Sequence, residues 1–565
     1  MSKREFLRRL LFLAFAIALV APIFDQPFAY PKGYDFRYFI AWIEAGRRSL
    51  LWYGDFPLWN PWTCGGQVYL ANPQSTIAAP TFLWALLFGT ALGTKLMLVS
   101  YLFFAQDGMY RLARHLDPAL DEDAAMLAAI VFGGSGWFGL HLSSGHLNFA
   151  GAALFPYLLL CHRRAITAWE WSIPLGALMA WIVGLGGTST AAMATVLLSL
   201  SALIEILRRP SLRPLSVLLL AALCSLLIGG ARLLPVFEFV RDHPRPMFET
   251  DHNTVPFLLR NALMWQGVQG VAGKRYWFHE YGWKLPYVAA PLLLLSLRWL
   301  RAGWQLWLLF AAGLAIAAGA AWPYGPWWLM KHLPLFKDLR VPSRYVLLCA
   351  LAAAPLVGVS AQRLLSGRSF RRPAMWALGL LCAVDAIAYS AWLYRDTFAL
   401  DMTTSRAPFH QVQGHWQQML TEILLNHGVI GCDEESPLQR AAALDLGDVP
   451  QARLADPSTG SVVMTRFSPN RLALRVEATT ESLVLLNTNW NEHWHSSRGE
   501  IVKYGDKHPR DRDGGRLAVR LPPGSHDLVV SYRPRSFSIG LAFSLFGGAA
   551  LAALFGWQRR RRRRA

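Results

Sequence analysis

The chain has 565 residues, of which 54% are hydrophobic and 16% are charged, and its formal net charge is +19. Apolar runs recur along the whole sequence and exceed what one globular core needs. This excludes a small soluble protein and indicates a polytopic membrane protein. No basic face with interleaved aromatic residues lies outside the apolar runs, so we do not expect nucleic-acid binding.

About 12 segments meet the requirement of roughly 20 mostly apolar residues for a membrane-spanning helix. We expect them near 8–24, 92–112, 124–140, 147–161, 171–186, 190–207, 214–236, 284–298, 304–321, 344–360, 374–393 and 537–557. The stretch from Pro80 to Arg114 is too long for one span. Residues 81–90 are therefore predicted to form a short interfacial helix before the second span.

Lys and Arg recur in alternate loops of this arrangement, as at Arg8 and Arg9, at Arg163 and Arg164, and in the run from Arg559 to Arg564. Short cytoplasmic loops are enriched in these residues, so both termini are expected in the cytoplasm. The large loops 25–91, 237–283 and 322–343 are then expected on the outer side. The terminal arginine run is expected to act as a stop-transfer anchor at the lipid headgroups.

Residues 395–536 are predicted to form an extracytoplasmic domain, α/β at first and then a small β-sandwich. Alternating apolar residues predict strands at 471–478, 482–490, 516–523 and 526–534, and the PPGSH turn is expected to join the last two as a hairpin. A short helix is expected around 411–426. The chain thus divides into a mainly α transmembrane domain, 1–394, this outer domain, and a C-terminal anchor with a cytoplasmic tail, 537–565.

The six cysteines are scattered and show no CxxC or metal-ligand spacing. Four of them lie in expected spans, so neither a disulfide framework nor a zinc site is predicted. Cys64 and Cys432 would both lie on the outer side, where they could meet, but we expect no bridge.

Ionisable residues at the outer ends of the spans are candidates for function, because a charge at membrane level needs a partner. They are Asp35, Arg232, Glu238, Glu280, Arg340 and Arg344. Each also has a structural explanation: Asp35 could cap the following helix, and Glu238 could pair with Arg232. As a group they suit transfer from a lipid phosphate, in which a carboxylate removes a proton and cations stabilise the departing phosphate.

Several ordered stretches resemble the bacterial YfhO-type membrane proteins, which are placed among the GT-C glycosyltransferases. They are GYDF at 33–36, GDFPLWNPWTCGG and then ANPQS at 54–75, AAMLAAIVFGGSGWF with a later GH at 124–146, HEYGWKLPYVAAPLLLL at 279–295, LPLFKDLRVPSRY at 333–345, FSPNRLALRVEA at 467–478 and LPPGSHDLVVSYRPRSFSIGLAFSL at 521–545. One stretch departs from the family, because NWNEHWHSS at 489–497 replaces a Tyr-Pro-Gly-Trp type of turn. A ligand contact of that turn is therefore not carried over.

The resemblance implies a GT-C fold whose active site lies in the first outer loop, 25–91, with an essential acid early in that loop. Asp35 matches this position, and Asp55 is the alternative acid. The resemblance also implies an inverting enzyme that takes a sugar from undecaprenyl phosphate and adds it to a cell-envelope glycan or glycolipid outside the bacterial cytoplasmic membrane. Its partners would then be that donor, the acceptor and membrane lipids.

On this basis Asp35 is the expected base, and the donor phosphate is expected to bind Arg232, Arg340 and Arg344. The sugar pocket is expected to be formed by Trp59, Asn60, Trp62, Asn72, Gln74, His146, Glu238, Glu280 and Trp283, although tryptophan also populates the membrane interface. No cofactor is expected, and no metal, because no carboxylate pair with ligand spacing is visible; some GT-C enzymes do use a metal.

Two other functions remain open from the sequence. A non-catalytic assembly factor that binds glycolipid would keep the aromatic loops but tolerate the loss of Asp35. A lipid or polysaccharide transporter would show paired halves or broken helices near the membrane midplane. The polar residues here collect at one face instead, which disfavours the transporter.

Overall fold

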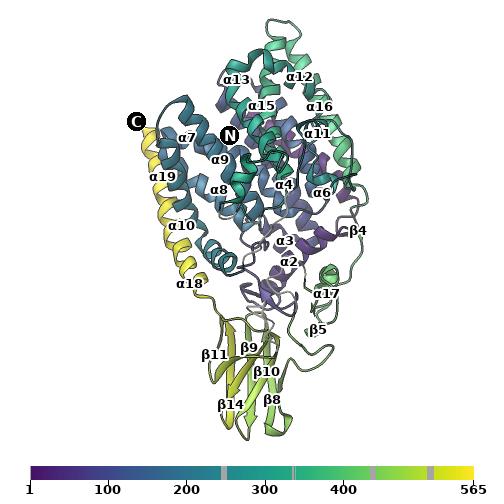
Figure 1. The fold of residues 1–565 in the computed structure, drawn as a ribbon, viewed down its shortest axis with the longest axis vertical. Coiled ribbons are helices and arrows are strands. Elements are labelled where there is room, and N and C mark those ends of the chain that lie inside the picture. Colours follow the sequence, from purple (N-terminus) through teal and green to yellow (C-terminus); the bar gives the residue numbers. More distant parts are fainter. Residues whose placement is uncertain are drawn as a thin grey trace.

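The computed structural model describes residues 2–243, 251–333, 336–337, 339–432, 441–505 and 515–564. Helices form the larger part of the molecule, and a β-sandwich lies at one end of the helical part (Figure 1). Parts of the motif at 333–345, namely 334, 335 and 338, lie outside the described residues.

Seven helical segments of the described chain are long and apolar enough to cross a membrane. Three of them are single helices: Thr188–Arg208 (α9), Arg213–Asp242 (α10) and Arg371–Tyr394 (α16). Three join two helices: Glu122–Ser143 contains α5 (Glu122–Gly133) and α6 (Gly136–Ser143), Ala289–Ala317 contains α12 (Ala289–Leu295) and α13 (Leu300–Ala317), and Arg535–Gln558 contains α18 (Arg535–Ala542) and most of α19 (Gly548–Arg564). The seventh, Pro342–Leu365, contains α15 (Val346–Leu365). The protein is therefore a mostly helical, membrane-embedded protein.

The expected number of about 12 spans is not confirmed. The predicted spans at 284–298 and 304–321 fall within the single candidate Ala289–Ala317. Other predicted spans are short helices, since α1 (Lys3–Leu19) has 17 residues and α7 (Phe155–Thr167) and α8 (Ser172–Gly184) have 13 each. The longer α4 (Thr90–Leu116) carries charged residues along its length.

Two of the candidate spans form the centre of the helical part. The segment with α5 and α6 and the segment with α15 are each 89% buried over their most apolar window, whereas the C-terminal segment is 6% buried. The small residues of α15, as in CALAAAP at 349–355, allow neighbouring helices to approach closely. The C-terminal α18 and α19 lie along α10 at the edge (Figure 1). The two central segments are therefore the most buried of the seven candidate spans in the described chain.

The segment 25–91 lies between the helices and the sandwich (Figure 1). It contains β1 (Tyr30–Pro31), α2 (Tyr34–Leu51), the pair β2 (Trp59–Asn60) and β3 (Gln67–Val68), and α3 (Phe82–Phe88). Strand β1 pairs with β4 (Phe398–Leu400), which brings the start of α2 beside the start of the outer domain. Gly89, with φ +79°, separates α3 from α4, in agreement with the short helix expected at 81–90.

The outer domain contains two four-stranded antiparallel sheets. One has the order β12 (Glu500–Tyr504), β13 (Arg516–Leu521), β10 (Ser482–Asn489), β7 (Ala452–Leu454), and the other β11 (Trp494–Ser496), β14 (Gly524–Tyr532), β9 (Arg471–Ala478), β8 (Gly460–Ser468). The four predicted strands are present as β9, β10, β13 and β14. The predicted hairpin is wrong, because β13 and β14 belong to different sheets and the PPGSH turn passes between them.

The smaller elements before the sandwich are β5 (His410–Val412), α17 (Met419–Leu424) and β6 (His427–Val429), and α17 lies where a short helix was expected. Two further short helices, α11 (Val255–Arg260) and α14 (Pro326–Lys331), lie in the loops of the helical part.

A disulfide joins Cys64 to Cys432, so the expectation that these cysteines stay unbridged is wrong. The backbone explains the pairing. The carbonyl of Val429 accepts a hydrogen bond from Gly65 N, and the carbonyl of Trp62 accepts one from Val429 N, so β6 lies beside the loop that carries Cys64. No local pattern indicates this contact, because 368 residues separate the two cysteines.

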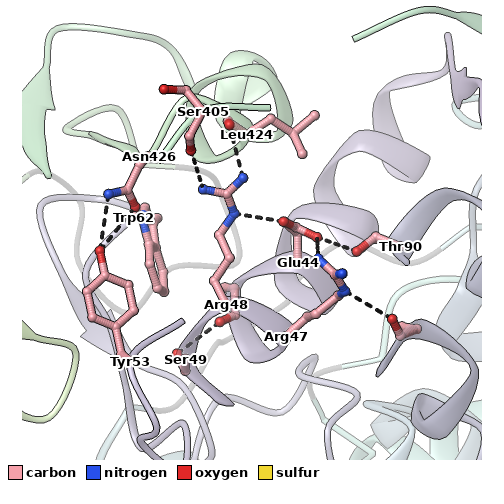
Figure 2. Close-up of polar contacts among 12 residues, drawn as sticks. Glu44, Arg47, Arg48, Ser49, Tyr53, Trp62, Thr90, Ser405, Leu424 and Asn426 are labelled. Atoms are coloured by element: carbon pink, nitrogen blue, oxygen red, sulfur yellow. Dashed lines mark hydrogen bonds and ion pairs between the residues drawn. The ribbon is translucent and has the colours of Figure 1, made fainter. Parts of the chain in front are cut away.

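A buried ion pair fixes α2 (Figure 2). The Arg48 side chain has no exposed surface, and its Nε donates to Glu44 Oε1 at 2.7 Å. Its Nη2 donates to the carbonyl of Leu424 at 2.9 Å, and the other Glu44 oxygen accepts a hydrogen bond from Thr90 Oγ1. This network ties α2 to α4 and to the end of α17.

Replacing Arg48 by Met is expected to lower the free energy of unfolding by about 3–5 kcal/mol, because Glu44 would remain buried without its partner. The thermal unfolding midpoint of the purified protein measures the change. The double variant Glu44→Gln, Arg48→Met should recover part of the loss. As a control, Arg241→Met removes an ion pair whose Arg241 side chain is 61% exposed, and it should leave the unfolding midpoint nearly unchanged, because solvent screens the pair.

Because of the disulfide, the number of cysteine thiols that can be alkylated should depend on whether the protein has been reduced. The free cysteines Cys161, Cys224, Cys349 and Cys382 are all buried. Alkylation of the denatured protein with a maleimide that shifts its gel mobility should modify four thiols without a reductant and six with one. The Cys64→Ser, Cys432→Ser variant should show the same count in both conditions. Six modified thiols in the denatured protein without a reductant would contradict the bridge.

Candidate functional site

Five ionisable side chains from distant parts of the sequence meet at one end of the central helices. Asp35 lies in the first turn of α2, His141 in the last turn of α6, and His146 just beyond that helix. Glu280 ends the 3₁₀ helix Phe278–Glu280, and Arg344 lies in the 3₁₀ turn Pro342–Tyr345 that leads into α15. We call these five residues the charged cluster.

The first contact of the charged cluster joins Asp35 to His146. The distance from His146 Nε2 to Asp35 Oδ2 is 2.9 Å, and the Asp35 side chain keeps 45% of its surface exposed. Partial burial raises the pKa of Asp35, but the hydrogen bond from His146 and the nearby imidazoles outweigh it, so the pKa lies below its usual value of 3.8. Asp35 is therefore an ionised carboxylate that is open to solvent at neutral pH.

Gly145 allows His146 to reach Asp35, because it has no side chain. It has φ +95°, and a Cβ atom built on it would lie 2.2 Å from the backbone nitrogen of Phe36 and 2.8 Å from the carbonyl carbon of Asp35. Only glycine permits so close a backbone approach in this conformation. The GH pair at 145–146 thus brings the imidazole of His146 next to the start of α2.

His141 extends the contact inward. Its side chain is fully buried, and its Nδ1 lies 3.0 Å from Nδ1 of His146. The chain from His141 through His146 to Asp35 therefore runs from the interior of the helical part to the exposed carboxylate.

The second contact is the pair of Glu280 and Arg344. Arg344 Nε donates to Glu280 Oε2 at 2.7 Å, and Arg344 Nη2 donates to Oε1. Glu280 is 5% exposed; its burial opposes ionisation, but the guanidinium holds its pKa well below the usual range. The guanidinium also lies over the ring of Phe149, with 4.6 Å between its carbon and the ring centroid. Arg344 is thus fixed on two sides.

His279 lies between the two contacts. Its ring centroid is 4.8 Å from that of His146, and its Nε2 is 3.7 Å from Glu280 Oε1. Burial lowers the pKa of His279 to about 4, so the imidazole is neutral at neutral pH. This neutral, buried imidazole therefore lies between the Asp35–His146 contact and the Glu280–Arg344 pair and adds no charge there.

Arg340 lies at the border of the charged cluster. Its guanidinium carbon is 5.9 Å from the ring centroid of Tyr276. Burial raises the pKa of Tyr276, while the charges of Arg340 and Arg344 both act on this hydroxyl in the opposite direction. The positive charges of both arginines therefore lower the pKa of the same tyrosine hydroxyl.

Four of the predicted site residues meet in the charged cluster, namely Asp35, His146, Glu280 and Arg344, and Arg340 lies beside it. Sequence reasoning missed His141 and His279. His141 lies inside an apolar helix, where a lone histidine resembles a satisfied core residue. The available signals were its spacing of five residues from His146, in HLSSGH, and the HE pair at 279–280.

The structure places the predicted aromatic and amide residues of 59–62 against the outer domain. Trp59 donates through Nε1 to Thr488 Oγ1 and packs among Trp494 and Tyr532 in the sandwich core. Trp62 donates to Asn426 Oδ1, and Asn60 bonds to Thr63 within its own turn. These contacts hold the outer domain to the segment 25–91.

Arg232 is buried, with 3% of its surface exposed, and donates from Nη2 to the carbonyls of Asn72 and Ser75. Asn72 Oδ1 in turn accepts a hydrogen bond from Gln74 N. Arg232 thus orders the ANPQS loop from within the helical part, and no contact recorded for the described residues joins it to the charged cluster.

The remaining predicted residues also lie elsewhere. Asp55 Oδ2 accepts a hydrogen bond from Asn470 N of the sandwich. Glu238 accepts one from Ser536 and lies 3.7 Å from His493. Trp283 is buried and donates to the carbonyl of Leu258.

A groove of about 730 Å³ lies between the segment after α2 and the edge strand β8. Trp52, Tyr53, Arg406 and Phe409 line it together with residues 462–467 of β8, and it contains no residue of the charged cluster. Asp35 lies at the opposite end of α2, which has 18 residues and is about 27 Å long. The charged cluster and the groove are thus separate features at opposite ends of α2.

His141, His146 and Glu280 also form a set that could hold a metal ion, because one ligand atom from each lies within 4.8 Å of the others. They are the one such set of three or more histidine, cysteine or carboxylate residues found in the described part of the chain.

No family model matches this chain, and no curated protein matches it. Among solved structures, the crystal structure of ArnT from Cupriavidus metallidurans bound to undecaprenyl phosphate is similar over 77% of this chain and 87% of its own, with 13% identity and a TM-score of 0.45. The cryo-EM structure of the arabinofuranosyltransferase AftD from Mycobacteria is similar over 95% of this chain and 40% of its own, with 14% identity and a TM-score of 0.48. Both scores lie below 0.5, so neither carries the assignment, and the resemblance to YfhO-type proteins stays a prediction.

Replacing Gly145 by Ala is expected to separate His146 from Asp35 and to lower the thermal unfolding midpoint, because the added Cβ would overlap the backbone of Phe36. The control is Gly367→Ala, since Gly367 also has a positive φ, +74°, but no atom lies within 4 Å of the added Cβ. The control carries the conformational cost alone, roughly 1 kcal/mol. Equal shifts for the two variants would show that the close approach does not matter.

Proposed function

We propose that this protein is a membrane glycosyltransferase that transfers a sugar from a polyprenyl-phosphate donor to a cell-envelope glycan or glycolipid. The observation that carries the proposal is the charged cluster, in which an exposed, ionised Asp35 that contacts His146 and the fixed guanidinium of Arg344 both lie where the central helices end. The resemblance noted in the sequence supports the same chemistry at the same acid.

In the proposed reaction Asp35 accepts the proton of an acceptor hydroxyl. The acceptor oxygen forms a bond to the anomeric carbon of the sugar, and the bond from that carbon to the phosphate oxygen breaks. Polyprenyl phosphate departs with the electron pair, and Arg344 and Arg340 stabilise the negative charge that develops on it. His146 orients Asp35 and keeps it ionised.

The location of the site supports a lipid donor that is used outside the cytoplasm. The charged cluster lies at the end of apolar, membrane-crossing helices, so a polyprenyl chain can remain in the bilayer while its phosphate meets the arginines. The Cys64–Cys432 disulfide lies on the same side, and such bonds persist in oxidising compartments. Both observations agree with the outer orientation that the positive charges predict.

The groove beside β8 supports a polymeric acceptor. Its aromatic and arginine side chains suit sugar rings and their polar substituents. A glycan that lies in the groove and also reaches Asp35 has to span the length of α2. The proposal therefore favours an extended glycan over a small soluble acceptor.

The substitution Asp35→Asn tests the proposal. It should lower transfer by about 10²–10⁴-fold, the usual contribution of a general base, without changing the thermal unfolding midpoint by more than a few degrees. The measurements are the release of polyprenyl phosphate from polyprenyl-phosphate mannose and glucose by the purified protein, and the mass spectrum of envelope glycans from cells with and without it.

The matched control is Asp25→Asn, which changes an exposed aspartate that lies between α1 and α2 outside the charged cluster, and it should retain transfer. Loss of transfer with Asp55→Asn but not with Asp35→Asn would move the base to Asp55. If the envelope glycans of cells with Asp35→Asn equal those of the wild type, the non-catalytic glycolipid-binding function becomes the better description.

A further inference from the structure

We propose that His141, His146 and Glu280 bind one divalent transition-metal ion of the zinc class. The three residues come from two segments that lie far apart in the sequence, the end of α6 and the 3₁₀ helix Phe278–Glu280. One ligand atom of each lies within 4.8 Å of the others, His141 and Glu280 are buried, and 12% of the His146 side chain is exposed. The three side chains therefore lie near enough to one another to converge on a single ion.

The chemical nature of the donors selects the ion. Two imidazoles and one carboxylate form the three-ligand set that zinc uses in sites where a fourth position stays open for water or substrate. Imidazole also suits Co²⁺ and other first-row transition metals, whereas Mg²⁺ and Ca²⁺ prefer oxygen ligands throughout. We therefore assign the site to zinc-like ions rather than to magnesium.

The hydrogen bonds around the three residues are those of supported metal ligands. His146 uses Nε2 for Asp35, which leaves Nδ1 facing Nδ1 of His141 at 3.0 Å. Histidines that bind metals usually donate their second ring nitrogen to a carboxylate in this way, which fixes the tautomer and the orientation of the ring. Glu280 is held by Arg344, so its carboxylate is also fixed.

The charge balance favours a cation at this position. The two carboxylates and one guanidinium of the charged cluster sum to one negative charge, close to helices that avoid unpaired charge. A divalent ion changes this sum to one positive charge, which suits a phosphate-bearing ligand. The role of the ion in binding a phosphate depends on the proposed glycosyltransferase function, whereas the binding of the ion itself does not.

The test uses the purified full-length protein in nanodiscs, stripped with a chelator and then titrated with Zn²⁺ or with Co²⁺, whose visible absorption reports its ligands. We expect one ion per chain. The variants His141→Ala and Glu280→Gln should each weaken binding by at least about 100-fold, and Asp35→Asn, which removes the acceptor of the His146 hydrogen bond, by about 10–100-fold. His526→Ala, which changes a histidine of the sandwich, should leave binding unchanged.

Each outcome decides the proposal. Unchanged binding in His141→Ala and Glu280→Gln, or no stoichiometric Co²⁺ spectrum in the wild-type protein, overturns it and leaves a hydrogen-bonded histidine pair beside an ion pair. If His141→Ala does not fold, the comparison of Glu280→Gln with the wild type decides alone. A bound ion without any sugar transfer would uphold the metal site and reject the glycosyltransferase, whereas sugar transfer together with no stoichiometric Co²⁺ spectrum would do the reverse.

Discussion

The geometry of the region around α2 depends on a guanidinium that has no contact with solvent. Arg48 lies in the last turn of α2, and its pairing with Glu44 is stable only because further hydrogen bonds satisfy both groups. Since those bonds come from α4 and from the end of α17, α2 cannot rotate or shift without leaving a charge buried and unpaired. The helix that carries Asp35 at one end is therefore held to both the helical part and the outer domain.

At the N-terminal end of α2, charge and packing act together. Asp35 remains partly exposed, while His146 reaches it because Gly145 has no side chain in the way. The buried Glu280 is compensated by Arg344, which in turn is held over Phe149. Each ionised group of the charged cluster has a defined partner, and only Asp35 combines a full charge with open access. That combination is what a base needs in order to meet a substrate.

The segment 54–80 has a different role from the one its composition suggested. Its Trp and Asn residues were expected to line a sugar pocket, but Trp59 lies in the sandwich core and Trp62 bonds to Asn426. Cys64 adds a covalent link to the outer domain. The segment therefore fixes how the sandwich sits on the helical part, and the groove beside β8 follows from that placement.

The sequence alone determined the membrane class, the strands of the sandwich and four members of the charged cluster, because hydropathy, alternation and charges at the ends of spans are local signals. The number of spans, the pairing of β13 and β14 in different sheets, the Cys64–Cys432 bridge and the positions of His141 and His279 were decided by the tertiary structure. These features depend on which segments meet in space. Residues such as His141 and Glu280, or Cys64 and Cys432, are separated by more than a hundred residues of chain, and only packing brings their side chains together.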